Sequence, residues 1–229
     1  MKTPMKFIVV FILASLTIQS VQAQNNTYQN ASLDVFTKTY NANDQSLSNN
    51  IDRDISAGVS PVGINLENNS IQIMYLNQNL FNMQAWAIEY YKTSNEISNG
   101  ITAKIQNEAY IPMGITSDNT SLYVLYIKGD GKVSAWQLVE SSQNLNEVSE
   151  NVSPYLDQGY IPVGITLHND LYYALLLKIE ESTFKSWEIQ GFQGEYNMNS
   201  DIKQKINQNK IPFGFLSKEG VFNVLYVGF

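Results

Sequence analysis

The chain contains no cysteine and only one histidine, His168, among its 229 residues. The lack of cysteine excludes disulfide bonds, thiolate zinc sites and a cysteine nucleophile. A histidine-based triad or metal cluster would have to depend on His168 alone. Charged residues are also few, at 15%, while hydrophobic residues make up 44% and aromatic residues 12%. This composition excludes a disordered charged tail, is typical of a globular protein and favours β structure.

The familiar sequence motifs of hydrolases and metalloproteases are also missing. The chain has no Gly-x-Ser-x-Gly and no His-Glu-x-x-His, and it has no lysine- or arginine-rich stripe. Its net charge of -7 disfavours binding to nucleic acid or to anionic lipid. We therefore expect no catalytic residues, no bound metal or cofactor, and no nucleic-acid partner.

One apolar run, residues 7–16, stands near the N-terminus. Lys2 and Lys6 precede it, and the small-residue site at residues 21–23 follows it. This pattern predicts a signal peptide over residues 1–23, with a retained membrane anchor as the alternative. No later segment is long and apolar enough to span a bilayer. We expect a secreted, periplasmic or cell-surface protein, and such a cysteine-free, asparagine-rich chain is typical of a bacterial envelope.

A repeat of about 50 residues fills the rest of the chain. A Pro-x-Gly triplet recurs every 50 or 51 residues, starting at Pro61, Pro112, Pro162 and Pro212. Tryptophans recur at the same interval, at Trp86, Trp136 and Trp187, and Phe36 falls in the equivalent place one period earlier. The spacing predicts a single domain, residues 24–229, made of four repeats over about 33–82, 83–132, 133–183 and 184–229.

A helix is predicted between the Trp position and the Pro-x-Gly triplet of each repeat. Apolar residues recur there at i, i+4 and i+8, which places them on one helix face. These sets are Leu47, Ile51 and Ile55; Ile97, Ile101 and Ile105; Val148, Val152 and Leu156; and Met198, Ile202 and Ile206. Ser46, Asn95 and Asn146 are the expected N-caps. Gly58, Gly159 and Asn209 suit the left-handed conformation that ends a helix.

Three strands are predicted in each repeat, one at Trp, one at Pro-x-Gly and one apolar core strand after it. The core strands, residues 71–76, 122–127, 171–177 and 221–227, are almost continuously apolar, which indicates burial on both faces. Gly129-Asp130-Gly131 predicts a hairpin from a core strand to the next Trp strand. Each sheet is therefore expected to be a meander of a Pro-x-Gly strand, a core strand and the Trp strand of the next repeat.

Under that pairing, the last repeat lacks a Trp strand and the first Trp strand lacks partners. Joining the two ends would close the array, as in propellers, which protect their sheet edges in this way. The predicted fold is α+β, with four tandem repeats of three antiparallel strands and one helix closed into a propeller-like ring. An open array is the alternative.

The recurring residues each allow a structural and a functional interpretation. Proline suits a strand start or edge and glycine a bulge or a close backbone approach, so we favour a structural role for Pro-x-Gly over a ligand loop. A periodic Trp suits packing between repeats, and we expect Trp86, Trp136 and Trp187 in the core rather than facing a ligand. The same holds for the equivalent residues Tyr75, Tyr126, Leu176 and Tyr226, because one copy replaces Tyr by Leu.

Titratable residues offer little sign of catalysis. His168 is expected to be a surface turn residue. Glu89, Glu140 and Glu188 lie near the tryptophans, but at offsets that do not place them on one face of a strand. A carboxylate-dependent hydrolase is therefore an alternative that the spacing does not favour.

The third repeat carries a resemblance to a known group. Gln158-Gly159-Tyr160-Ile161-Pro162, the strand at residues 171–175 and Trp187 resemble the tandem repeats of secreted polyglycine-hydrolase-like proteins. Repeats 1 and 4 depart from the Gly-Tyr step, with Gly58-Val59 and Asn209-Lys210. In that family catalysis resides in a separate serine-hydrolase domain, so the resemblance implies a non-catalytic repeat module.

These patterns lead to a functional hypothesis. We expect a secreted, monomeric, non-catalytic module that binds an extracellular glycan or protein. A hydrolase that uses Asp and Glu carboxylates and a purely structural envelope protein are the alternatives.

Overall fold

The computed structural model describes residues 33–228, except residues 119, 143, 181 and 183–184. The predicted signal peptide, residues 1–23, lies outside the described residues.

The four repeats share one order of elements: strand, helix, strand, strand. The first contains β1 (Val35–Asn41), α1 (Leu47–Ser56), β2 (Ser60–Glu67) and β3 (Ser70–Leu76), followed by the short 3-10 helix η1 (Leu80–Asn82). The second contains β4 (Ala85–Tyr91), α2 (Ser94–Glu108), β5 (Tyr110–Ser117) and β6 (Leu122–Lys128). The third contains β7 (Val133–Ser141), α3 (Leu145–Leu156), β8 (Ile161–His168) and β9 (Leu171–Ile179). The fourth contains β10 (Ser186–Gln193), α4 (Glu195–Ile206), β11 (Lys210–Lys218) and β12 (Val221–Gly228).

Each repeat forms its own antiparallel three-stranded sheet. The core strand is central, so the first sheet has the order β1-β3-β2 and the other three follow the same order. The predicted pairing of each Pro-x-Gly strand with the core strand is confirmed. The predicted third strand is wrong, because a core strand pairs with the Trp strand of its own repeat and not with that of the next. The hairpin expected at Gly129-Asp130-Gly131 is also wrong. The central strand β6 already has β4 and β5 on its two edges, which leaves no edge for β7.

This topology sets the direction of every helix. In the first sheet β1 and β2 are both antiparallel to β3, so they run parallel to each other and α1 must return the chain to the start of β2. We call the two ends of a sheet the hairpin end, where β2 turns into β3, and the proline end, where Pro61 lies. All four helices begin at the hairpin end. The hairpin turn is tight, with positive φ at both Asn68 and Asn69, as a type I′ turn requires.

Most residues of the predicted helical stripes are buried. Ile97, Ile101, Val152 and Ile202 are at most 1% exposed. The expected helix ends are confirmed at Gly58, Gly159 and Asn209, which all have positive φ.

The helix starts differ from two of the predictions. Ser46 is the N-cap of α1 as expected, but α2 and α3 begin two residues earlier than predicted, with Thr93 and Asn144 as their N-caps. Each of these two side chains accepts the N–H of a glutamate three residues later, Glu96 or Glu147. This is the first of the two hydrogen bonds of a capping box, and it favours Thr93 and Asn144 over Asn95 and Asn146 as N-caps.

The Pro-x-Gly triplets have the structural role that was predicted. The strand register shifts within each triplet, which marks a β-bulge at the proline end. The glycines also allow close backbone approach between repeats: a Cβ on Gly164 would lie 2.8 Å from the Ile115 nitrogen. A Cβ on Gly214 would lie 2.9 Å from the Gly164 Cα, and one on Gly63 would lie 3.0 Å from the Gly214 Cα.

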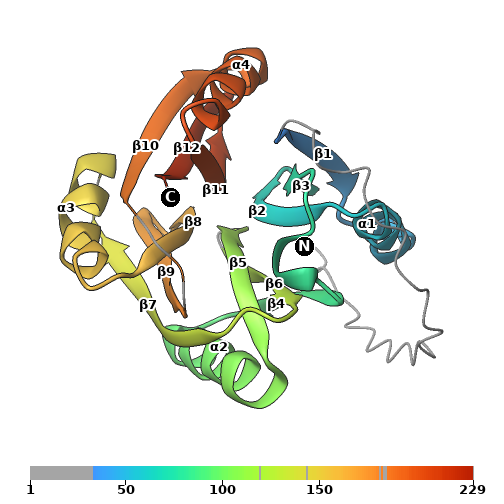
Figure 1. Ribbon diagram of the computed structural model, residues 1–229, viewed down its shortest axis with the longest axis horizontal. Coiled ribbons are helices and arrows are strands. Elements are labelled where there is room, and N and C mark those ends of the chain that lie inside the picture. The colour runs from blue at the N-terminus through green and yellow to red at the C-terminus, as the bar shows by residue number, and fades with distance from the viewer. Residues whose placement is uncertain (1–32, 119, 143, 181, 183–184, 229) are drawn as a thin grey trace, which may run out of the picture. The chain divides into compact units, whose positions relative to one another are not determined.

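Neighbouring repeats meet along the Pro-x-Gly strands. β2 packs against β5, β5 against β8, β8 against β11, and β11 against β2. Within residues 33–228, Figure 1 shows these four strands close together and the helices farther out. Polar contacts join them near the hairpin end. The Leu66 N–H donates to Thr116 Oγ1 at 2.8 Å, and the Ser217 N–H donates to Asn65 Oδ1 at 3.1 Å.

The position of Phe36 corrects the sequence alignment of the repeats. Trp86, Trp136 and Trp187 pair with the core-strand residues Ile127, Leu177 and Val227. The equivalent core residue of the first repeat is Leu76, and it pairs with Val35. Val35 therefore occupies the Trp position, one residue before the predicted Phe36. Because side chains alternate across a strand, Phe36 lies on the opposite face, where its ring stacks on Tyr75 at 5.6 Å.

Candidate functional site

The three tryptophans lie on the outer strands β4, β7 and β10 and are all half-buried. The Trp86 indole N–H donates to Asp52 on α1 at 2.6 Å. The Trp136 indole N–H donates to Thr102 on α2 at 3.3 Å. In both cases the partner belongs to the preceding repeat, so these side chains join one sheet to the helix of its neighbour. This geometry favours packing between repeats over a platform for a ligand.

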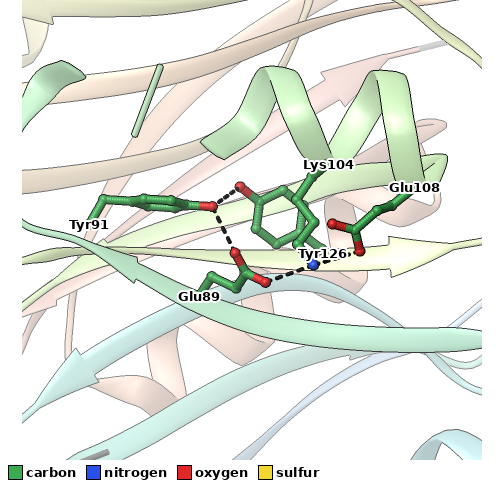
Figure 2. Close-up of polar contacts among 5 residues, drawn as sticks. All are labelled: Glu89, Tyr91, Lys104, Glu108 and Tyr126. Carbon is green, nitrogen blue, oxygen red and sulfur yellow. Dashed lines mark hydrogen bonds and ion pairs between the residues drawn. The ribbon is translucent and has the colours of Figure 1, made fainter. Parts of the chain in front are cut away.

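The equivalent core-strand residues Tyr75, Tyr126, Leu176 and Tyr226 are fully buried, as predicted. The sequence did not predict the polar clusters that the tyrosine hydroxyls form between sheet and helix. Figure 2 shows the cluster of the second repeat, in which the hydroxyls of Tyr91 and Tyr126 lie 2.8 Å apart. Tyr91 also donates to Glu89 at 3.2 Å.

Lys104 completes this cluster from α2. Its Nζ lies 2.7 Å from Glu89 and 2.9 Å from Glu108, and its side chain is almost fully buried. Burial acts to lower the pKa of Lys104, but the hydrogen bonds to Glu89 and Glu108 outweigh it and raise the pKa. Burial raises the pKa of Tyr126, and the neighbouring Tyr91 raises it further. Lysine and tyrosine therefore both stay protonated at neutral pH.

The other repeats vary the same arrangement. In the first, Tyr40 donates to Asp54 at 2.7 Å and contacts the Tyr75 hydroxyl at 2.8 Å. In the fourth, Tyr226 donates to Asp201 at 2.9 Å. In the third, where Leu176 replaces tyrosine, the corresponding polar contact joins Asn151 to Ser141. A motif that recurs in this way at helix–sheet boundaries holds the helices in place.

Two of the three glutamates near the tryptophans, Glu89 and Glu188, form ion pairs with lysines, which disfavours the carboxylate-hydrolase alternative. Glu188 is paired with Lys205 and Lys210. Burial acts to raise the pKa of Glu188, but the hydrogen bonds from the two lysines outweigh it and lower the pKa. A general acid in glycoside hydrolysis needs a raised pKa. Glu89 forms an ion pair with Lys104, whereas Glu140 is exposed on the third sheet.

His168 is not the surface residue that was expected. It is 9% exposed, and its Nδ1 lies 2.7 Å from Ser117 Oγ of the preceding repeat. Its Nε2 lies 3.0 Å from the amide nitrogen of Asn169. The neighbouring repeat covers a turn position that the sequence alone presents as exposed. With an amide donating to Nε2, Nδ1 carries the ring proton and donates to Ser117, which is the wrong direction for activating a serine nucleophile.

An apolar cavity of about 330 Å³ opens at the proline end of β8 and β11. It is lined mainly by apolar side chains from three repeats: Leu80, Phe81, Ile161, Val163, Ile179, Ile211 and Phe213. Leu80 and Phe81 come from the connection after β3, residues 77–84. The corresponding connections after β6 and β9 span residues 129–132 and 180–185. The connection after β3 is thus the longest of the three, and it contributes two apolar side chains to this cavity.

Phe81 is held in place by several contacts. Its φ of 56° lies in the left-handed region, which is uncommon for a bulky residue and occurs often at functional sites. Leu80 donates its N–H to Ser60 Oγ at 2.7 Å, and Asp130 donates its N–H to the Phe81 carbonyl at 2.8 Å. A Cβ on Gly131 would lie 2.5 Å from the Phe81 ring. The Gly-Asp-Gly segment that was predicted as a hairpin thus makes room for Phe81.

A second cavity, also of about 330 Å³, lies at the hairpin end between the second and third repeats. Lys92 and Ser94 line it from the start of α2, and His168, Asn169 and Tyr173 line it from the third repeat. This cavity is more polar than the first. The sequence did not predict either cavity, because each brings together loops from different repeats.

Two further features bear on function. Among the residues that the structure describes, no three His, Asp or Glu side chains gather closely enough to hold a metal ion. None of the helices in the described part of the chain is long and apolar enough to cross a membrane.

No protein-family model and no curated protein matches this chain.

Proposed function

We propose that the four sheets close into a propeller-like ring. Four successive contacts between Pro-x-Gly strands support this, because β11 of the last repeat packs against β2 of the first. The glycines of the four triplets are in close contact in the same order: Gly63 with Gly214, Gly214 with Gly164, Gly164 with Gly114, and Gly114 with Gly63. Helix α4 also contacts β1, which adds a second connection between the last and first repeats. Closure of this kind joins complete sheets and exchanges no strand between the ends of the chain.

We further propose that this ring is a secreted, non-catalytic module that binds an extracellular protein through the apolar cavity. The cavity beneath Phe81 carries this proposal. An apolar recess of this size suits a large apolar side chain, and such anchors dominate the energetics of protein recognition. A glycan, whose surface is rich in hydroxyl groups, fits its lining less well. The resemblance of the third repeat to a non-catalytic module and the sequence pattern of a signal peptide agree with this function.

Phe81→Gly tests the proposal, because Phe81 lines the cavity from the connection after β3. Glycine adopts the left-handed conformation without strain, so the variant removes the ring and keeps the loop. Tyr196→Ala is the control, because Tyr196 is 85% exposed on α4. The mature protein and both variants should be applied to peptide and glycan arrays and incubated with polysaccharides.

Retention of peptides with large apolar side chains, lost in Phe81→Gly and kept in Tyr196→Ala, supports the proposal. Release of sugars from a polysaccharide would replace it with the hydrolase alternative. The absence of both retention and turnover would favour a purely structural envelope protein. Peptide retention that Phe81→Gly leaves unchanged would move the binding site away from this cavity.

A further inference from the structure

The polar cavity at the hairpin end has an amphipathic lining. Leu122, Leu171 and the Tyr173 ring supply carbon surface, while Lys92, Ser94 and Asn169 supply an ammonium, a hydroxyl and an amide. Lys92, Ser94 and Asn169 are exposed, so their polar atoms are accessible from solvent. A pyranose has the matching chemistry, with C–H groups on its faces and hydroxyl groups at its edge.

His168 gives this cavity a fixed wall. One ring nitrogen of His168 is hydrogen-bonded to Ser117 and the other to Asn169. The centres of the His168 and Tyr173 rings lie 6.2 Å apart. The Thr93 side chain, which also lines the cavity, is occupied in capping α2. His168, Asn169 and Thr93 are thus already held in position by hydrogen bonds, which lowers the entropy cost of binding.

The turns around the cavity carry more acidic than basic side chains, which affects the class of sugar that can bind. All four helices begin at the hairpin end, and acidic residues suit helix N-termini. Among the described residues, acidic side chains outnumber lysines in the turns at this end: Asp44, Glu67, Glu96, Asp118, Glu147, Asp170, Glu195 and Glu219, against Lys92 and Lys218. Of the residues that line the cavity, Lys92 alone is a lysine or an acid, so an anionic sugar would be attracted by Lys92 but would meet net repulsion from the surrounding turns. A neutral sugar would meet no such repulsion.

We propose that this cavity binds one neutral sugar residue of an extracellular glycan. The site is separate from the apolar cavity, since the two lie at opposite ends of the Pro-x-Gly strands. The inference therefore goes beyond the protein contact proposed above and does not depend on it.

Asn169→Gly is the most direct test. Asn169 has a φ of 49°, so glycine keeps the turn and removes the amide. Asn68→Gly is the matched control, because Asn68 occupies the equivalent turn of the first repeat with a φ of 48°. Lys92→Met is a second variant that removes the ammonium from an exposed position. Binding should be followed by two-dimensional NMR titration of the mature protein with methyl glycosides of neutral hexoses, N-acetylhexosamines and uronic acids.

We expect saturable shifts near His168 and Tyr173 with at least one neutral glycoside. Loss of one hydrogen bond should weaken that binding about tenfold in Asn169→Gly and in Lys92→Met, with no change in Asn68→Gly. Phe81→Gly should bind sugar normally, which separates this result from the outcome of the peptide experiment. The inference is overturned if no neutral glycoside gives saturable shifts, if uronic acids bind more tightly, or if Asn169→Gly and Asn68→Gly behave alike.

Discussion

Substitution of Gly164 by alanine places a methyl group where two neighbouring repeats touch through their backbones. The added Cβ would lie 2.8 Å from the Ile115 nitrogen and 3.1 Å from the Gly114 Cα. Backbone atoms cannot rotate away as the end of a side chain can, so β8 and β5 must separate. Overpacking of this kind costs about 1–3 kcal/mol of the free energy of unfolding. At about 2–4 °C per kcal/mol for a domain of this size, Tm should fall by roughly 2–12 °C.

Gly191→Ala provides the comparison. Its Cβ would meet only the Asn223 side-chain oxygen, at 3.1 Å, and Gly191 lies on the outer strand β10. Because alanine restricts the unfolded chain more than glycine does, this variant should be neutral or gain up to about 1 kcal/mol. Thermal unfolding followed by circular dichroism measures both variants. Equal Tm values for Gly164→Ala and the unmodified protein would refute the close approach of the Pro-x-Gly strands.

Two further predictions concern the buried aromatic residues. Burial is the main cause that raises the pKa values of Tyr75 and Tyr126 in the folded state. The stability that these two groups contribute is therefore complete below the unfolded pKa of about 10 and is lost as pH rises above it. Urea unfolding at increasing pH should show this fall, reduced in Tyr126→Phe and unchanged in Tyr196→Phe; a curve that is flat through pH 11 or so would contradict it. Trp136→Ala should cost roughly 2 kcal/mol, about half the value for a fully buried tryptophan, because this side chain is half-buried between repeats. An unchanged Tm would instead indicate that Trp136 faces solvent and is free to meet a ligand.

The sequence predicts the repeated elements well because their spacing is physically constrained. An apolar residue at every fourth position suits only a helix face, and this identified α1 to α4 correctly. Pro-x-Gly combines a residue without an amide donor with one without a side chain, which suits a bulge at a close backbone contact. The left-handed helix ends at Gly58 and Gly159 follow from the same backbone chemistry.

Strand pairing could not be predicted with the same certainty. A central strand such as β6 could pair with the Trp strand before it or after it, and the short segment at Gly129-Asp130-Gly131 favoured the wrong choice. Pairing within the repeat depends on the helix crossover, which returns the chain beside its own first strand. The two-residue turn at Asn68-Asn69 favours the hairpin between β2 and β3, which both choices contain, so it does not distinguish them. The sequence alignment of the first repeat was also wrong by one residue, because it placed Phe36 at the Trp position that Val35 occupies.

The candidate sites were harder to predict than the elements, because they depend on contacts between repeats. His168 looks like a turn residue in sequence, and only the adjacent Ser117 makes it a buried one. The connection at residues 77–84 is longer mainly because β3 ends earlier than β6 and β9, which the sequence spacing does not show. Its use could not be inferred before Phe81 was seen to lie against Gly131 and the ends of β8 and β11.

Closure between the last and first repeats is best tested by cross-linking. The Ser217 hydroxyl donates to Glu67 at 2.9 Å, although the two residues lie in different terminal repeats. Because the chain has no cysteine, Glu67→Cys combined with Ser217→Cys creates a unique pair of thiols for a short bismaleimide. Native protein should form an intramolecular cross-link that mass spectrometry assigns to these two positions, and urea should abolish it. Failure to form this link in the native protein, or links only between molecules, would contradict a closed ring.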